Sequence, residues 1–124
     1  MRSSTNSLRS TLLAYYSLVD SEAIDEVLSL FSEDATYMRC ESFYNGIVEI
    51  ERFYREERKI RGNHDIKNLW LVGRIGIVEG TFSGRGAGGQ PKQVGFADFF
   101  TFNQEGKISV RRTYLQLGGA YVKE

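Results

Sequence analysis

The sequence predicts a single α+β domain over residues 1–124, in which three N-terminal helices cover the concave face of a strongly bent sheet. Two observations predict this fold class. Apolar residues recur at helical spacing in the first half of the chain, and they alternate with polar residues at strand spacing in the second half. Composition supports the bend, because one proline and 13 glycines suit long strands that turn and curve at glycine.

Composition and charge exclude several classes of protein. The 16 basic and 16 acidic side chains give zero formal net charge, so no nucleic-acid partner is expected. No apolar run approaches the roughly 18 residues that a membrane span needs. One cysteine, Cys40, and one histidine, His64, are too few for a zinc site, and nucleotide and flavin motifs are lacking, so we expect neither metal nor cofactor. The chain opens without a leader pattern, which predicts a cytoplasmic protein.

Two helices are expected to form a hairpin at the start of the chain. Asn6 or Ser7 can cap the first helix, whose apolar stripe turns Tyr15 inward. Asp20 or Ser21 can cap the second. The two stripes consist of Leu8, Leu12, Tyr15 and Val19, and of Ile24, Val27, Leu28 and Phe31.

A third helix is expected from Asn45-Gly46 to the residues before Gly62-Asn63, where glycine can take the left-handed conformation that ends a helix. The charged residues within 49–59 are interpreted as its solvent face, on which oppositely charged residues four positions apart form ion pairs. The inward stripe consists of Ile47, Ile50, Phe53 and Tyr54.

Strand patterns appear first at 35–40, where Tyr37 and Arg39 share one face. Four later segments, at 64–73, 75–83, 93–102 and 107–117, are separated by glycine-containing turns and predict an antiparallel meander. The glycine-rich stretch at 84–89 lies between two of these strands. It is therefore interpreted as a hairpin loop, because a phosphate-binding loop would open a helix.

The most informative polar residue is Asp98, which alternates with Phe96 and Phe100 and so places one carboxyl in an aromatic row. Desolvation there favours the neutral form of the acid, whereas an ion pair favours the charged form. Two interpretations follow. The residue is either the partner of Arg39 or Arg111 in a structural ion pair, or a proton donor or acceptor in a pocket.

Three further positions have a chemistry that depends on which way they face. Glu79 shares a strand face with Ile77 and is a second candidate for a buried carboxylate. His64 is either an exposed turn residue or, if it turns inward, a proton shuttle near neutral pH. Arg111 and Arg112 lie on opposite faces of one strand, so one of the two points inward.

Several segments together carry a resemblance to a known superfamily. They are LFSEDAT at 30–36, Gly46 followed by Ile50 and Phe53-Tyr54, and DFFTF at 98–102 followed by Gly106-Lys107-Ile108 and Arg112. In order and spacing they resemble the nuclear-transport-factor-two-like, or SnoaL-like, superfamily, which includes ketosteroid isomerase. The resemblance covers roughly residues 10–117. It implies a cystatin-like conical barrel with a mixed, mostly antiparallel sheet, a fold that hosts enzymes, binding proteins and transport factors.

The resemblance also implies roles for individual residues. Tyr15 matches the first-helix tyrosine that donates to the substrate oxyanion in ketosteroid isomerase, and Asp98 matches the protonated aspartate that donates beside it. Tyr54 matches a tyrosine that supports these hydrogen bonds. Arg39 stands where that enzyme has its aspartate general base, so steroid isomerisation by the same mechanism is not expected.

Our leading hypothesis is a cofactor-independent enzyme that isomerises, dehydrates or cyclises a small hydrophobic or aromatic metabolite through an enol. Under this hypothesis Tyr15 and Asp98 stabilise an oxyanion, and Arg39 anchors an acidic group. His64 or Glu79 moves the proton. The rest of the substrate pocket is expected to consist of Tyr37, Tyr54, Trp70, Phe96, Phe100, Arg111 and Thr113.

The alternative hypothesis is a non-catalytic module that binds a small molecule or forms dimers, with a pocket plugged by an ion pair between Arg39 and Asp98. Members of the superfamily often dimerise through the outer face of the sheet, where Val110 and Tyr114 are expected. A homodimer is expected under either hypothesis.

Overall fold

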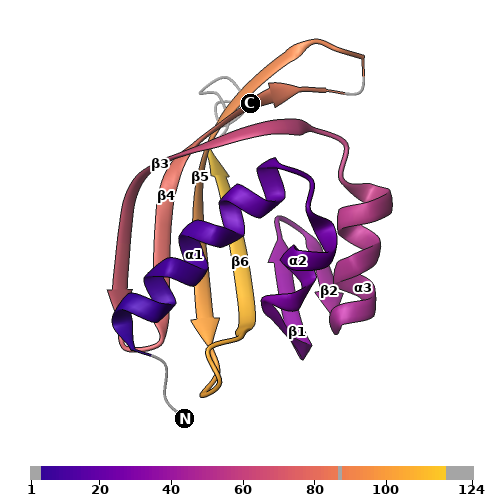
Figure 1. The fold of residues 1–124 in the computed structure, drawn as a ribbon. Helices are drawn as coiled ribbons and strands as arrows, with labels where there is room; N and C mark the ends of the chain where they lie inside the picture. Colours follow the sequence, from indigo (N-terminus) through magenta and orange to yellow (C-terminus); the bar gives the residue numbers. More distant parts are fainter. Residues whose placement is uncertain (1–3, 87, 117–124) are drawn as a thin grey trace.

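The computed structural model describes residues 4–86 and 88–116. Its centre is a strongly curved six-stranded sheet with strand order β2-β1-β6-β5-β4-β3 (Figure 1). β1 pairs with β6 in parallel, and the other neighbouring strands pair antiparallel. The predicted α+β fold with a mixed, mostly antiparallel sheet is confirmed. The strands are β1 (Phe31–Arg39), β2 (Ser42–Asn45), β3 (Arg61–Val72), β4 (Ile75–Arg85), β5 (Pro91–Phe102) and β6 (Ile108–Gln116).

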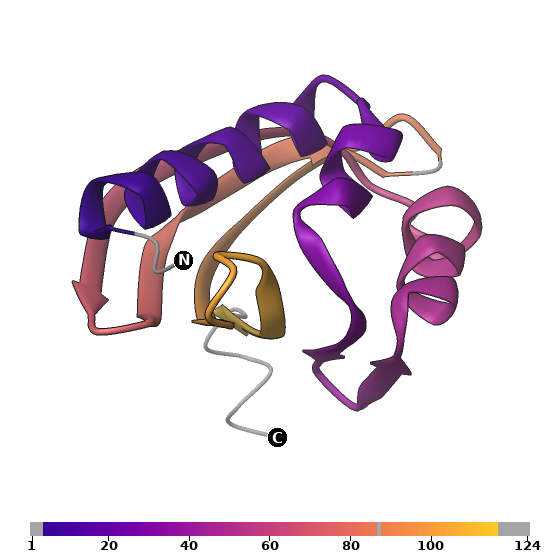
Figure 2. The same cartoon turned by 60° about the horizontal axis from the view of Figure 1, so that its bottom comes forward.

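The sheet has a cone-like curve but remains open. Within the described ranges, β2 and β3 each have a neighbouring strand on one side only. Figure 2 shows the first helix running along the concave side over β3 and β4, and the third helix beside β1 and β2. None of the described helices is long and apolar enough to cross a membrane. The helical segments are α1 (Thr5–Asp20), α2 (Ile24–Ser29), α3 (Ile47–Arg52) and the π-helix η1 (Phe53–Glu57).

α1 begins earlier than predicted because Ser4, rather than Asn6 or Ser7, is its N-cap. The Ser7 backbone N–H donates to Ser4 Oγ at 3.1 Å, which satisfies one of the unpaired donors at the start of the helix. The buried face contains the predicted stripe and also Tyr16. α1 therefore turns two neighbouring tyrosines, Tyr15 and Tyr16, toward the sheet.

α2 is shorter than predicted at both ends. Its N-cap position is Ala23, which makes no side-chain cap bond, so neither Asp20 nor Ser21 caps this helix. Phe31 belongs to β1 instead of the helix, because its backbone pairs with Ile108 of β6 and its ring is buried. Sheet pairing thus overrides the helical periodicity at this residue.

The predicted third helix divides into α3 and η1. The Arg58 backbone N–H donates to the Phe53 carbonyl oxygen at 2.9 Å, which is the five-residue step of a π-turn. The wide turn leaves both Phe53 and Tyr54 buried. The helical segment ends earlier than predicted, and Gly62 and Asn63 lie inside β3, because this strand continues pairing with β4 to its first residue.

The four later strands form the predicted antiparallel meander, and the stretch at 84–89 connects β4 and β5 as a hairpin. Gly84 and Arg85 are themselves part of β4. Two residues of the predicted segments lie outside the described residues: Ala87 of the loop at 84–89 and Leu117 at the end of the strand at 107–117. The short strand β2 was not predicted. It follows a turn in which Cys40 has a positive φ of 53°, and it pairs back on β1.

The strand register on the concave face brings distant residues into two adjacent rows. Pairing of β1, β6 and β5 places Arg111 inward and leaves Arg112 on the outer face, where its guanidinium lies 5.5 Å from the centre of the Phe99 ring. One inner row contains Tyr37, Arg111 and Phe100, and the next contains Arg39, Thr113 and Asp98.

Candidate active site

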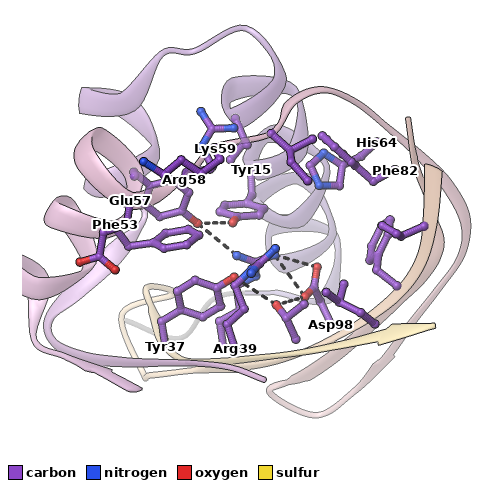
Figure 3. A pocket seen from close by; sticks show the side chains of 18 residues that line it. Tyr15, Tyr37, Arg39, Phe53, Glu57, Arg58, Lys59, His64, Phe82 and Asp98 are labelled. Atoms are coloured by element: carbon purple, nitrogen blue, oxygen red, sulfur yellow. Dashed lines mark hydrogen bonds and ion pairs between the residues drawn. The ribbon is translucent and has the colours of Figure 1, made fainter. Parts of the chain in front are cut away.

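A cavity of about 320 Å³ lies between the concave face of the sheet, α1 and the η1 segment. This volume is at the lower end of the range, roughly 300–1,000 Å³, typical of pockets for small molecules. Figure 3 shows side chains entering from opposite walls, with His64 and Phe82 on one side and Tyr37 and Phe53 on the other. Nine of the predicted site residues line it: Tyr15, Tyr37, Arg39, Tyr54, His64, Phe96, Asp98, Arg111 and Thr113.

Asp98 is fully buried and accepts hydrogen bonds from three side chains. Arg111 Nη2 lies 3.2 Å from Oδ1 and 3.0 Å from Oδ2. The Thr113 hydroxyl donates to Oδ1 and the Tyr16 hydroxyl to Oδ2, each at 2.5 Å. Each carboxylate oxygen is therefore paired with one hydroxyl and with the Arg111 guanidinium, which makes a charge-assisted contact.

The buried ion pair therefore joins Asp98 to Arg111, and not to Arg39, which was the other partner considered. The Arg39 guanidinium instead lies 5.7 Å from the centre of the Phe53 ring. The predicted plug between Arg39 and Asp98 is absent from the described residues, and the cavity remains beside the Arg111–Asp98 pair.

Arg111 connects this carboxylate to a cluster of tyrosines. Its Nη1 donates to the Tyr54 hydroxyl at 3.2 Å. Its guanidinium carbon lies 4.5 Å from the Tyr37 ring centre and 4.9 Å from that of Tyr15. Burial alone would lower the pKa of Arg111, but the Asp98 carboxylate and the tyrosines raise it above its usual range, so the side chain stays charged. Its Nε is buried and has no hydrogen-bond partner among the described residues.

The hydroxyls of Tyr15 and Tyr54 are hydrogen-bonded to each other in the buried wall of the cavity. This bond uses one of the two hydroxyl hydrogens, while Arg111 donates to the oxygen of Tyr54. The described residues offer no further acceptor, so one hydroxyl hydrogen of the pair remains for a guest in the cavity. Burial raises the pKa of Tyr54 to about 12 and the pKa of Tyr15 well above its usual range, so both are neutral donors at physiological pH.

His64 faces inward and is held by Asp20. Its Nδ1 lies 2.6 Å from Asp20 Oδ1, and its backbone N–H donates to Oδ2 at 2.8 Å. A carboxylate partner places the ring hydrogen on Nδ1 and leaves the lone pair on Nε2. Burial lowers the pKa of His64 below its usual value, an effect that the Asp20 charge partly offsets. The rings of Phe82 and Phe96 pack against the imidazole at 4.7 and 5.3 Å.

Three predicted site residues lie away from the cavity. Glu79 is exposed on the outer face and accepts a hydrogen bond from Asn68 at 2.9 Å, so the expected buried carboxylate was wrong. Trp70 pairs with Ile77 on the same outer face and its side chain is 48% exposed. Phe100 is buried behind the cavity wall, where its ring packs against Tyr15.

Sequence reasoning missed two residues that support the site, Tyr16 and Asp20. Tyr16 follows Leu12 by four positions, so helical spacing alone allows it on the apolar stripe. The predicted stripe runs through Tyr15, three positions after Leu12, and therefore omits Tyr16. Asp20 lies four positions further along the same face of the helix. Its role depends on His64 of β3, 44 residues later, and the sequence offers no local signal for that pairing.

Comparison with known proteins agrees with this architecture. Residues 12–111 match the family described as the SnoaL-like domain. A search of curated proteins found no significant match. The fold is similar to an NTF2-like protein of unknown function from Exiguobacterium sp. 255-15, with a TM-score of 0.77 and 22% identity over 87% of this chain and 99% of that one.

Two further solved structures share the fold. An LEH-like epoxide hydrolase from M. tuberculosis has a TM-score of 0.78 and 18% identity over 88% of this chain and 82% of that one. A protein with a ketosteroid isomerase-like fold from Catenulispora acidiphila, solved with trimethylamine, has a TM-score of 0.76 and 20% identity over 86% and 85% of the two chains. The family match spans most of the sequence and the fold agrees with it, so the chain belongs to the SnoaL-like domain family.

Proposed function

We propose that the chain is a cofactor-independent enzyme of the isomerase, dehydratase or cyclase type. It would remove a proton from a small hydrophobic or aromatic molecule to form an enolate and then return that proton. One observation carries the proposal. An imidazole fixed by a carboxylate and a phenolic pair backed by a buried arginine line the same cavity. These are the two groups that enolate chemistry needs, a base for the C–H proton and a donor for the oxygen.

His64 is the base in this mechanism. Its Nδ1–H is committed to Asp20, so Nε2 is the nitrogen that can take a proton from the carbon beside a substrate carbonyl. The lowered pKa keeps the ring neutral at pH 7 and therefore able to accept that proton. As the C–H bond breaks, its electron pair forms a C=C bond to the carbonyl carbon, and the carbonyl π pair moves to the oxygen. The imidazolium then returns the proton to another carbon in an isomerisation, or to a departing hydroxyl in a dehydration.

The Tyr15–Tyr54 pair is the donor to the developing oxyanion. Its remaining hydroxyl hydrogen is available in the cavity, and Arg111 donating to Tyr54 makes that hydrogen a stronger donor through the chain of hydrogen bonds. Asp98 acts as a positioning residue, because its two oxygens are occupied by Arg111, Thr113 and Tyr16. This assignment differs from the protonated donor expected from the resemblance to ketosteroid isomerase.

The test uses 2-tetralone, an aromatic ketone with acidic hydrogens beside its carbonyl, in deuterated buffer. We expect the protein to accelerate the loss of the α-proton NMR signal above the buffer rate. His64→Gln should abolish the acceleration, and Tyr54→Phe should reduce it by about 10²–10³, the usual effect of losing an oxyanion donor. Lys67→Gln, an exposed change in a surface pair, is the matched control. Equal exchange rates with and without the protein would contradict the proposal.

We also propose that the chain forms a homodimer through the outer face of the sheet. Trp70, Ile77 and Phe99 lie side by side on this face in the strand register. Exposed apolar patches of this kind mark association surfaces, and a two-fold axis would place the same patch on both copies. The most exposed large apolar side chains on the face are Phe43, Trp70, Val72, Ile75 and Tyr114.

A further inference from the structure

We propose that the molecule held in the cavity is a carboxylic acid, with its carboxylate bound by Arg39, Arg58 and Lys59 and its hydrophobic body directed toward the tyrosines. The three cations line the same cavity as His64 and Tyr54. The inference rests on the proposed function for the fate of the substrate, but the binding it predicts can be measured without any reaction.

Arg58 provides a buried donor that the protein does not use. Its side chain is only 11% exposed, and its Nη2 donates to Glu22 at 2.7 Å. Its Nε is buried without a hydrogen-bond partner in the described residues. A buried guanidinium N–H without an acceptor costs free energy, and a carboxylate oxygen that entered beside Arg58 as its side chain shifted would satisfy it.

Arg39 and Lys59 add positive charge that no described acidic side chain pairs with. The guanidinium of Arg39 lies over Phe53 and that of Arg58 lies 5.9 Å from the centre of the Tyr54 ring. These two rings have centroids 5.1 Å apart, so both cations flank one aromatic corner of the cavity.

The two acidic residues of the cavity do not cancel this charge. Asp98 is neutralised by Arg111 at 3.0 Å. Glu57 is held by Arg52 at 2.8 Å and accepts from the Tyr44 hydroxyl at 2.8 Å, and this pairing lowers the pKa of Glu57. The unpaired charge at the cavity is therefore positive, which selects an anionic group on the guest.

A carboxylate suits this cavity better than a phosphate. The volume of about 320 Å³ is small and most of its wall is aromatic or aliphatic, so the guest needs a hydrophobic body with one compact anionic end. A planar carboxylate can accept two hydrogen bonds from the edge of a guanidinium group. A phosphate dianion carries two negative charges, which one buried N–H of Arg58 and the partly exposed cations Arg39 and Lys59 would balance less well.

Binding of three related probes tests this inference. Calorimetric titration would compare 3-phenylpropionate, its uncharged amide 3-phenylpropionamide and 2-phenylethyl phosphate in low-salt buffer at neutral pH. We expect the carboxylate to bind about tenfold more tightly than the amide and more tightly than the phosphate ester, with the advantage shrinking as salt screens the charges. Equal affinity for acid and amide would overturn the inference, and tighter binding of the phosphate ester would overturn the choice of carboxylate.

Substitutions identify the residues responsible. Arg39→Met with Lys59→Met should weaken binding of 3-phenylpropionate about tenfold, to the affinity of the amide. Arg58→Lys keeps a cation beside Glu22 but removes the planar Nε donor, and should weaken acid binding severalfold. Both changes should weaken binding of the amide less than binding of the acid, because the amide carries no charge. Arg9→Met removes an exposed charge from α1, away from the cavity, and is the matched control.

The two proposals fail separately. If 3-phenylpropionate binds as expected and 2-tetralone shows no catalysed exchange, the acid-binding site stands and the enzymatic function does not. If 2-tetralone is exchanged and the double variant binds 3-phenylpropionate like the Arg9→Met control, the function stands and the acid-binding site does not.

Discussion

Arg111 and Asp98 form a buried ion pair across neighbouring strands, with Arg111 Nη2 at 3.0 and 3.2 Å from the two carboxylate oxygens. The Asp98 side chain is 0% exposed and that of Arg111 7%. Such a pair must offset the cost of removing two charges from water, and the extra hydrogen bonds from Tyr16, Thr113 and to Tyr54 contribute to that offset. Losing one partner should therefore cost much more than losing both.

Replacing Asp98 with asparagine should destabilise the protein strongly, because Arg111 would remain as an unpaired buried charge. We expect a loss of about 3–5 kcal/mol in the free energy of unfolding, measured by urea titration. The double variant Asp98→Leu with Arg111→Leu should lose less than Asp98→Asn alone. Asp65→Asn, which breaks an exposed pair with Lys67, should cost less than about 1 kcal/mol. If Asp98→Asn also cost less than about 1 kcal/mol, Arg111 would not depend on Asp98 as the partner of its buried charge.

The single imidazole of the chain makes the state of His64 directly measurable. We expect the midpoint of its NMR titration to lie below the ordinary pKa of 6.5, because burial disfavours the charged ring. In the neutral form the hydrogen should be on Nδ1. The unfolded chain then binds a proton at a higher pH than the folded chain. Stability should therefore fall as pH drops from about 6.5 toward the lowered pKa of His64.

A variant at Asp20 separates the two influences on that imidazole. Asp20→Asn removes the charge that raises the pKa of His64, so the titration should move lower still. A shift to higher pH in this variant would contradict the geometry of the dyad. Asp65→Asn, beside His64 in sequence but exposed, should leave the titration nearly unchanged.

The fold was predictable from local patterns because each element carries its own periodicity. The alternation in 93–102 and 107–117 predicted two strands that pair in the structure, and the helical stripe of α1 predicted the burial of Tyr15. Errors occur where pairing with a distant segment decides the outcome. Phe31 fits a helix by spacing but joins β1, because its partner Ile108 lies 77 positions later in the chain and is invisible to a local window.

The candidate site was predictable in its residues and less so in their connections. The alternation around Asp98 was sufficient to predict a carboxyl in an aromatic row, yet the choice between Arg39 and Arg111 depended on strand register and on side-chain reach. The His64–Asp20 dyad joins a helix end to a strand, and the π-turn of η1 replaces the last part of the predicted helix while Phe53 and Tyr54 stay buried as predicted. Neither feature leaves a periodic signal in the sequence.

Alkaline pH should unfold the protein partly through Tyr54. Burial raises the pKa of Tyr54 to about 12, whereas an exposed tyrosine in the unfolded chain titrates near 10, so the folded state retains its proton longer. Stability is fully present below about pH 10 and falls as pH rises toward 12, by about 2–3 kcal/mol for this group. Tyr54→Phe should flatten that decline when unfolding is followed by circular dichroism at several pH values. An unchanged slope in the variant would assign the decline to other groups.

The only tryptophan reports on the proposed dimer. Trp70 is half exposed on the outer face, so a dimer through this face would bury it and shift its fluorescence emission to shorter wavelength. We expect emission to move to longer wavelength on dilution, in step with the loss of the dimer in sedimentation equilibrium. Tyr114→Lys should abolish both changes without altering the fold. Monomers at micromolar concentration, with emission independent of dilution, would contradict the homodimer.

Gly80 links strand packing to the position of His64. A Cβ added at Gly80 would lie 2.1 Å from the Asp65 carbonyl oxygen, a backbone atom that cannot move aside without shifting β3. The pairing of β3 with β4 changes register just beyond this point, between Ile66 and Asn68, and His64 lies directly before Asp65. Gly80→Ala should therefore destabilise the protein by about 3 kcal/mol or more and disturb the site as well.

The control for this effect is Gly88→Ala, where the nearest atom to the added Cβ is the Gln90 side-chain oxygen at 2.8 Å, at the end of a flexible chain. We expect Gly88→Ala to change stability by less than about 1 kcal/mol. In Gly80→Ala, the imidazole resonances of His64 should move because β3 must separate from β4 and draw Nδ1 away from Asp20. If the variant kept both its stability and its histidine spectrum, the close approach of these strands would not be what holds His64 against α1.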